Sequence, residues 1–353
     1  MTLAVPPRRL ESGAALAFLR AQPGAGNASH VGLGGRVFGS VAAALAEQLR
    51  AAAVEPLAMA LLHPARPVLD TWAVAVDAPQ AVMHEHGCVR YATDGRWLHG
   101  CAKVNESAFE GGLEAATRAA YADLFAVLAA SACPQLLRLW NHFADMNRET
   151  GGVERYRQFN AGRQQAFTKA GRSAFDGAPA ACALGTAAGP LRVYFLAGTK
   201  PPLAIENPRQ VSAYRYPDRY GPRSPTFSRA ALIDAGDGRQ ALFISGTASI
   251  IGHETVHVGD VRRQTEESLV NIGAVLGAAA AGAGGPIDVH GLTCTVYLRH
   301  AADLPVVREV FERHVGADSP AARDAVYLHA DICRADLLVE IEAHGFVPHR
   351  SPS

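Results

Sequence analysis

Apolar and polar residues alternate along the chain in a way that predicts strands and helices in turn from about residue 67 onwards. Strand-like runs lie at 98–104, 136–143 and 192–197, and a helix of about five turns is expected at 112–130. Before residue 67 the pattern is mixed. One helix is expected there, over Ser40–Ala53, because Val41, Leu45 and Leu49 have helical spacing.

A second series repeats the order of the first. It consists of a strand at 244–250, a helix at 262–276 behind the capping residue Asp260, a strand at 294–299, a helix at 304–315 and a strand at 338–343. The tripeptide Pro-Ala-Ala occurs in both series, at 179–181 and 320–322. We therefore expect two copies of one α+β unit. Lys200-Pro-Pro202 would connect them, because adjacent prolines cannot continue a helix or a central strand.

Composition excludes several classes of protein. The chain has 353 residues, enough for two domains, and its formal net charge is zero, which argues against a nucleic-acid partner. The six scattered cysteines indicate reduced, buried thiols in a cytoplasmic protein. No signal peptide is expected at the N-terminus. The Ala/Gly tract 277–285 indicates a loop or a helix end, and it is far too short to span a membrane.

Short motifs of the second series resemble the RidA/YjgF family, whose members pack as trimers with ligand clefts between subunits. The fold implied is α+β, with two tandem RidA/YjgF-like (chorismate-mutase-like) units, sheets covered by helices, and an N-terminal extension. A homotrimer and a monomer with three-fold-like internal packing both remain open. The motifs are Ile244-Ser-Gly-Thr-Ala-Ser249, Gly259-Asp with Gln264 and Asn271-Ile, Val296-Tyr-Leu-Arg299, Pro320-Ala-Ala-Arg323 and Val339-Glu-Ile-Glu342.

Two upstream segments carry a second resemblance, Glu154–Arg163 (ERYRQFNAGR) and Gln210–Pro225 (QVSAYRYPDRYGPRSP). Together with the RidA-like half, they resemble the chorismatase family, which hydrolyses chorismate or forms hydroxybenzoates, over about residues 90 to 345. The resemblance implies a small-molecule enzyme that releases pyruvate from chorismate. Protonation-driven ether cleavage requires no metal or cofactor. The expected domains are 1–200, a degenerate unit with the extension, and 201–353, which carries the active site.

The residues at two positions imply, by resemblance to members of the family, which product the enzyme forms. By resemblance, hydrolytic members have Gly at the variable position of the Gly-Thr-x-Ser strand and Ala seven residues before the acid. Members that form 3-hydroxybenzoate have Ala and Cys at these two positions. This chain has Ala248 and Cys333. The expected products are therefore 3-hydroxybenzoate and pyruvate, with 4-hydroxybenzoate as a further product in some relatives.

Glu340 is the expected acid. Cleavage of an enol ether begins most easily by protonation of its terminal methylene carbon, so the enzyme needs a positioned proton donor. In a strand, Glu340 points away from the face of Val339 and Ile341, and burial of its face would raise its pKa. The alternation of Glu340 and Glu342 with apolar residues favours, by itself, carboxylates on a solvent-facing side of the strand. The family resemblance reverses that interpretation and favours a Glu340 that faces the active site.

The two carboxylates of chorismate call for arginines, whose planar guanidinium matches a carboxylate in two hydrogen bonds. About two of the four candidates are expected to touch substrate, and the others to lie on the surface or in ion pairs. Tyrosines of the 210–225 segment would bind a carboxylate or simply pack the two halves together. The candidates are Arg163, Arg219, Arg223 and Arg299, with Tyr214, Tyr216 and Tyr220.

Thr247 is a further substrate-binding candidate. With Ser249 it would face away from Ala248 unless the strand bulges at Gly246. Cys333 is expected to line the pocket wall rather than act as a nucleophile, because no histidine stands at a clearly suggestive spacing. There it would exclude a hydrolytic water.

His253-Glu-Thr-Val-His257 has the form of a zinc motif, but the motif requires a helix. The glycines on both sides and the β-branched residues inside indicate a loop, so we expect no metal site. Three functional alternatives remain beside 3-hydroxybenzoate formation. They are chorismate hydrolysis to a dihydroxycyclohexadiene carboxylate, a RidA-like imine deaminase, and a non-catalytic aromatic-acid-binding protein.

Overall fold

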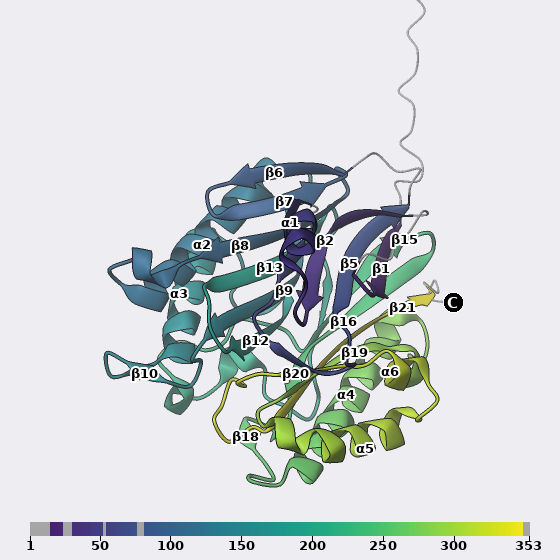
Figure 1. Ribbon diagram of the computed structural model, residues 1–353. Coiled ribbons are helices and arrows are strands. Elements are labelled where there is room, and N and C mark those ends of the chain that lie inside the picture. Colours follow the sequence, from purple (N-terminus) through teal and green to yellow (C-terminus); the bar gives the residue numbers. More distant parts are fainter. Residues whose placement is uncertain (1–14, 24–29, 52–53, 76–80, 349–353) are drawn as a thin grey trace, which may run out of the picture.

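The computed structural model describes residues 15–23, 30–51, 54–75 and 81–348. A first unit forms a six-stranded sheet in the order β12-β9-β13-β8-β7-β6, with α2 and α3 packed on one face (Figure 1). Its elements are β6 (Val82–His86), β7 (Val89–Thr93), β8 (Trp97–Val104), α2 (Gly112–Ala130), β9 (Gln135–Ala144), α3 (Arg155–Lys169), β12 (Ala180–Thr186) and β13 (Leu191–Gly198).

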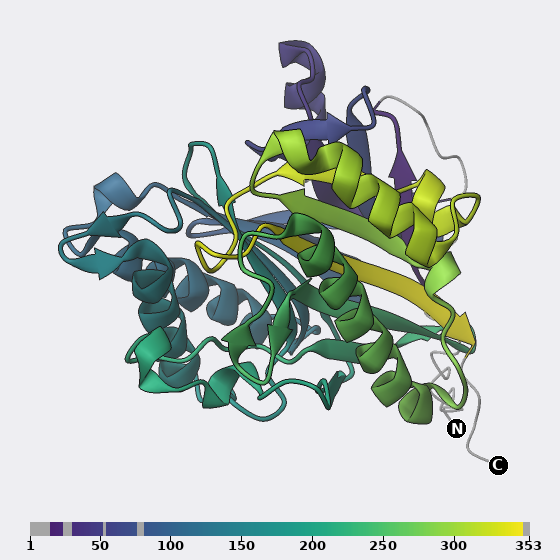
Figure 2. The same ribbon diagram turned by 90° about the horizontal axis from the view of Figure 1, so that it is seen from below.

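A second unit repeats this arrangement, with α4 and α5 on the outer face of its sheet. Figure 2 shows the two helix pairs on opposite sides of the molecule. The elements are β14 (Leu203–Ile205), β15 (Ala230–Gly236), β16 (Arg239–Ala248), α4 (Val261–Ala283), β19 (Thr293–Leu298), α5 (Leu304–Val315), α6 (Pro320–Arg323), β20 (Val326–His329) and β21 (Val339–Pro348). Residues 199–202 join the two units. Two small hairpins are β10 (Glu149–Thr150) with β11 (Val153–Glu154), and β17 (Ile250–Ile251) with β18 (Glu254–Thr255).

The strand orders of the two units confirm the internal repeat. The second sheet runs β20-β19-β21-β16-β15-β14, and in each unit only the first pair of strands is parallel. The predicted equivalence of the two Pro-Ala-Ala tripeptides is wrong. Ala180 and Ala181 pair with β9 in a strand, whereas Pro320 opens the short helix α6, which Ser319 caps through the Ala322 amide.

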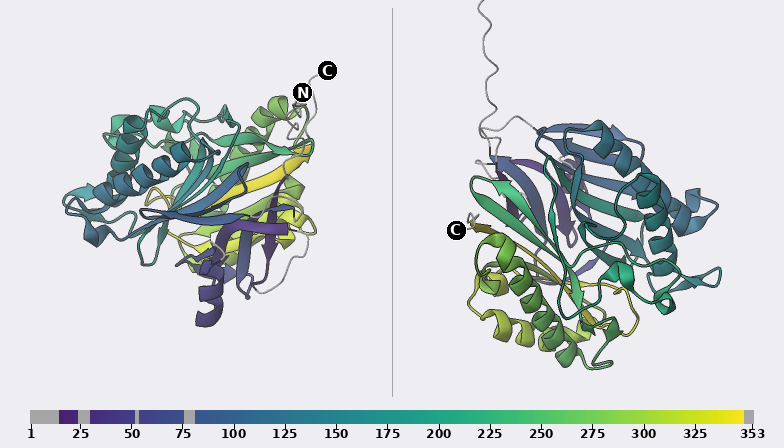
Figure 3. Two further views of the ribbon diagram at one scale, coloured as in Figure 1. Left: turned by 90° about the horizontal axis from the view of Figure 1, so that it is seen from above. Right: turned by 180° about the vertical axis from the view of Figure 1, so that it is seen from behind.

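The N-terminal residues, expected as an extension, form a third sheet in the order β1-β5-β2-β3. Helix α1 covers its outer face through Leu45 and Leu49, and Val41, just before the helix, packs with them. The inner face joins both repeated units around one common apolar core, and Figure 3 shows these strands packed across the two units. The elements are β1 (Leu16–Ala21), β2 (His30–Phe38), α1 (Ala43–Ala51), β3 (Val54–Pro56) and β5 (Val68–Ala75), while β4 (Ala60–His63) extends the second unit's sheet beside β20.

Helix α4 is longer than its sequence pattern predicted. Asp260 caps it through the Arg263 amide, as expected, but the helix continues past Leu276 to Ala283, where Gly284 takes a left-handed conformation. The Ala/Gly tract is therefore mostly helix, because Ala279 and Ala283 pack against the sheet. Within the described ranges, no helix combines the length and apolarity needed to cross a bilayer.

Candidate active site

A cavity of about 350 Å³ lies between the two repeated units. The first unit lines it with the start of α3 and with β12, and the second with β16, β21 and the loop 333–336. Residues 216–229, from the segment that joins β14 to β15, complete the wall. The two upstream segments singled out in the sequence, 154–163 and 210–225, thus both contribute residues to this cavity.

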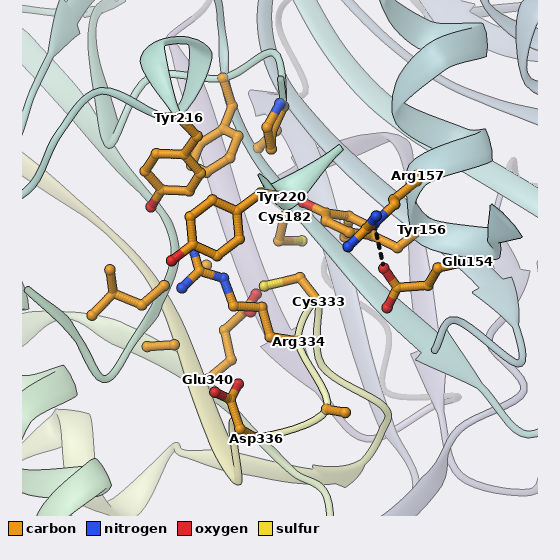
Figure 4. Close-up of a pocket in the computed structure, with 18 of the residues that line it drawn as sticks. Glu154, Tyr156, Arg157, Cys182, Tyr216, Tyr220, Cys333, Arg334, Asp336 and Glu340 are labelled. Carbon is orange, nitrogen blue, oxygen red and sulfur yellow. Dashed lines mark ion pairs between the residues drawn. The ribbon is translucent and has the colours of Figure 1, made fainter. Parts of the chain in front are cut away.

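Glu340 points into this cavity from β21 (Figure 4). Its neighbours Val339 and Ile341 face the opposite way, into the core beneath α4, so the strand alternates as predicted. Glu340 and Glu342 are each only 4% exposed, because their face of β21 lies against the other sheets and not against solvent. Burial and the charge of Glu342 raise the pKa of Glu340 to about 8. The carboxyl group therefore holds a proton at neutral pH.

Three arginines line the cavity without a carboxylate partner among the described residues: Arg163, Arg229 and Arg334. Arg163 is 1% exposed and Arg229 is 5% exposed. The Nε atoms of both, and Nη2 of Arg334, are buried and have no hydrogen-bond partner in the described chain. Buried, unneutralised guanidinium groups favour an anionic ligand.

Two further arginines at the cavity are already paired. Arg157 lies 3.4 Å from Glu154, as the dashed line in Figure 4 marks, and Arg219 pairs with Glu254. These pairs are partly exposed, so solvent screens them. The positive excess of the cavity comes from the three unpaired arginines.

Aromatic rings form one wall. The Arg334 guanidinium lies 4.0 Å from the Tyr220 ring centre and 5.2 Å from that of Tyr216, and the two rings contact each other at 5.5 Å. Arg229 donates a hydrogen bond to the Tyr216 hydroxyl at 2.7 Å. These contacts hold Tyr216, Tyr220 and Arg334 together above Cys333 and Glu340 (Figure 4).

Cys333 and Ala248 lie on the cavity wall near Glu340. Ala248 pairs with Glu340 across β16 and β21. Burial, followed by the charge of Glu340, raises the pKa of the Cys333 thiol to about 12, so the sulfur stays protonated at neutral pH. A neutral thiol is a poor nucleophile, which agrees with the expected role as a wall.

The segment His253–His257 lies in the β17–β18 hairpin and the turn after it, and His257 has a positive φ of 60°. It is not a helix, so its two histidines cannot form the zinc-binding face. The described residues contain no cluster of three or more metal-ligating side chains.

Residues 70–197 match the family model described as chorismatase FkbO/Hyg5-like, N-terminal. A 3-hydroxybenzoate synthase of Streptomyces hygroscopicus is 41% identical over 288 residues, which cover 79% of this chain and 81% of that protein. The chain belongs to the chorismatase family. A chorismatase of Streptomyces rapamycinicus is 40% identical over 73% of this chain and 77% of that protein.

A crystal structure of a chorismatase covers 95% of this chain and 99% of its own, with a TM-score of 0.80 and 28% identity. The expected fold class, two helix-covered RidA/YjgF-like units in tandem, is confirmed by this match and by the repeated strand order. Because this match covers 95% of the chain, it includes most of the N-terminal sheet.

Seven of the eleven candidate site residues line the cavity. They are Glu340, Cys333, Ala248, Arg163, Tyr216, Arg219 and Tyr220. Tyr214 lies outside it and donates to Asp176, and Arg223 is exposed. The register is shifted between Ile244 and Thr247, as a bulge at Gly246 would require, but Thr247 donates to Ser245 O and does not line the cavity.

Arg299 also lies away from the cavity. Its Nε donates to Leu337 O at 2.8 Å and its Nη2 to Ile332 O and Arg334 O at 3.0 Å, while Nη1 pairs with Asp331. All three nitrogens are used inside the second unit. Arg299 therefore shapes the loop that carries Cys333 and Arg334.

Sequence reasoning missed Arg229, Arg334, Tyr156 and Cys182. Arg334 directly follows Cys333, and Arg229 lies four residues beyond the tyrosine-rich segment, so both stand next to motifs that were already noticed. Cys182 comes from β12 of the first unit. Its position depends on the packing of β12 beside β16, where the Ala181 amide donates to Ser245 Oγ, and no local sequence pattern predicts that packing.

Proposed function

We propose that the chain converts chorismate to 3-hydroxybenzoate and pyruvate. The observation that carries the proposal is a buried, protonated carboxyl group, Glu340, in a cavity with three unpaired arginines. Chorismate brings two carboxylates and an acid-labile enol ether, which are the groups that such a cavity suits. The names of the related proteins, 3-hydroxybenzoate synthase and chorismatase, support the substrate class.

Arg163, Arg229 and Arg334 would hold the two substrate carboxylates. Arg163 and Arg229 are almost fully buried, so charge-assisted hydrogen bonds there are stronger than at a surface. The Tyr216 and Tyr220 rings would pack on the ring of the substrate. Binding a dianion beside Glu340 raises the pKa of this carboxyl further. The carboxyl group therefore stays protonated in the bound complex until it transfers its proton to the enol ether.

Glu340 would protonate the terminal methylene carbon of the enol ether and produce an oxocarbenium-like centre. The neighbouring ring hydroxyl then bonds to the ring carbon that carries the ether. The carbon–oxygen bond breaks, and its electron pair stays on the oxygen of departing pyruvate. The hydroxyl oxygen loses its proton and bridges the two ring carbons as an epoxide. Its bond to the carbon that first carried it then breaks with the electron pair on the oxygen, the other carbon loses its proton as the ring aromatises, and the oxygen takes up one proton. The proton remaining restores Glu340, so no water is consumed.

Cys333 and Ala248 would favour this internal route. Their side chains occupy cavity wall beside Glu340, where a hydrolytic water would otherwise approach the ring. The resemblance of these positions to those of 3-hydroxybenzoate-forming members supports this assignment.

The test is incubation of the purified protein with chorismate, without metal or nucleotide, in ¹⁸O-labelled water. Products are analysed by chromatography with mass detection. We expect equimolar pyruvate and 3-hydroxybenzoate, with no label in the phenolic oxygen. Pyruvate with a non-aromatic dihydroxy acid would overturn the product assignment, and unchanged chorismate would overturn the proposed substrate.

A further inference from the structure

Glu342 is a second buried carboxylate on the strand that carries Glu340. Only Ile341 separates these two residues along β21, so both side chains leave the same face of the strand. Glu342 does not line the cavity, and the proposed reaction does not use it. A buried charge is costly unless it is paired, so its surroundings decide what it does.

Cations and a hydroxyl from three sheets hold Glu342. Arg138 of β9 donates to Oε2 at 2.6 Å, Arg36 of β2 to Oε1 at 3.4 Å, and the Tyr297 hydroxyl of β19 to Oε1 at 2.8 Å. Burial by itself would raise the pKa of Glu342, but Arg36 and Arg138 lower it to about 2. Glu342 is therefore a permanent negative charge at neutral pH.

This charge lies directly behind the active-site wall. The Cys182 side chain lines the cavity and lies close enough to the Glu342 carboxylate to help lower its pKa. Tyr297 pairs with Glu340 in the sheet while its hydroxyl reaches Glu342. Glu342 and Arg138 thus form an ion pair that does not line the cavity and acts on Glu340 from behind its wall.

We propose that Glu342, fixed by Arg36 and Arg138 where the three sheets meet, is a positioning residue whose negative charge keeps the proton on Glu340. The inference rests on the proposed role of Glu340 as the acid. A nearby like charge disfavours ionisation of a carboxyl group, whereas a nearby cation favours it. Glu342 and Arg138 therefore act on Glu340 in opposite directions.

Among the titratable groups facing the two carboxylates, those with shifted pKa values titrate outside the neutral range. Burial lowers the pKa of His142 on β9 to about 3 and that of His344 on β21 well below its usual value. Burial also raises the pKa of the thiols and phenols. These are Cys182 on β12, Cys333 in the loop, Tyr297 on β19 and Tyr156 on α3. The charged groups that remain are Arg36 and Arg138 with Asp70 on the core side, and Arg229, Arg163, Arg334 and Asp336 on the cavity side.

The experiment is infrared difference spectroscopy of the full chain from about pH 5 to 10. It follows the carbonyl band of the protonated carboxyl group that Glu340→Gln removes. Glu342→Gln is expected to lower the titration midpoint by on the order of one pH unit, and Arg138→Met to raise it. Tyr297→Phe, which changes no charge, should leave the midpoint in place. The alkaline limb of kcat/KM should move with the midpoint in each variant.

An unchanged midpoint in Glu342→Gln, or shifts of the same sign in Glu342→Gln and Arg138→Met, would overturn the inference, since a general packing disturbance has no charge sign. If Arg138→Met does not fold, Glu342→Asp provides the test. A carboxylate at position 342 should return the titration midpoint to its wild-type value, which Glu342→Gln lowers. Normal turnover in Glu340→Gln would refute the acid role alone, and the infrared midpoints would still test the charge relationship.

Discussion

The Glu340 side chain of β21 packs directly against Gly246 of the neighbouring strand β16. A β-carbon added at Gly246 would lie 2.6 Å from Glu340 Cδ and would collide with Oε1. The carboxyl group thus occupies the space that any other residue at position 246 would fill. The glycine of the Gly-Thr-Ala-Ser motif is explained by the acid next to it and not by a turn.

Gly246→Ala is expected to displace the end of the flexible Glu340 side chain and lower kcat by about 10²-fold or more, with the fold retained. Gly273→Ala is the matched control, because a β-carbon there meets nothing within 4 Å. Alanine in this helix should leave activity unchanged and stabilise the protein by about 0.5–1 kcal/mol. Steady-state kinetics and thermal unfolding check both variants. Full activity in Gly246→Ala would contradict the placement of Glu340.

Glu340→Gln is expected to lower kcat by about 10²–10⁴-fold with little change in KM, because the amide keeps the shape of the side chain but cannot deliver the proton. For the wild type, kcat/KM should fall as pH rises through about 8, where Glu340 loses its proton. A pH series on both proteins makes the measurement, with exposed Glu309→Gln on α5 as a neutral control. A rate that is flat from pH 7 to 10 would argue against Glu340 as the acid.

Glu340 also links stability to pH. Its pKa is about 8 in the fold against an ordinary value of 4.5, so the folded protein holds a proton that the unfolded chain releases in between. This contribution is complete below about pH 4.5 and is lost as pH rises through about 8. Glu340→Gln should therefore gain stability over the wild type above pH 8, by roughly 1–3 kcal/mol. Denaturant unfolding at pH 6 and pH 9 measures the gain, and an equal difference at both pH values would contradict it.

Arg229→Met is expected to lower kcat/KM by at least about tenfold, because a buried guanidinium that faces the ligand is lost. Arg223→Met should stay within about twofold of the wild type, since this exposed side chain does not line the cavity. Comparable losses in the two variants, measured by kinetics and by calorimetric binding of product, would show that the 210–225 segment closes differently around substrate.

Ala248→Gly combined with Cys333→Ala is expected to divert product from 3-hydroxybenzoate to the non-aromatic dihydroxy acid. The two changes remove a methyl group and a sulfur from the wall beside Glu340 and admit water. Chromatography with mass detection gives the ratio, and the pyruvate yield controls for total turnover. An unchanged ratio with normal pyruvate release would assign product choice to other residues.

Much of this molecule is visible in its sequence. Local hydrophobic periodicity marked α2, β9, α5 and the repeat, because those elements bury one face on a sheet next to them. Local sequence pattern gave the wrong prediction for two parts of the fold. The Pro-Ala-Ala match misplaced the β12 equivalent, and the N-terminal sheet looked like a mere extension because its short strands pair in an order unrelated to their sequence order.

Sequence by itself determined the family and the two repeated units, since these depend on local pattern and on motifs, and the family resemblance made Glu340 the proposed acid. Tertiary structure decided which residues share the cavity. Arg299 and Thr247 direct their hydrogen bonds to groups of the second unit and do not line the cavity, while Arg229 and Arg334 line it and each keep one buried nitrogen without a hydrogen-bond partner among the described residues. It also decided that Glu342 is charged and Glu340 neutral, because Arg36 and Arg138 reach Glu342 from sheets formed by distant parts of the chain.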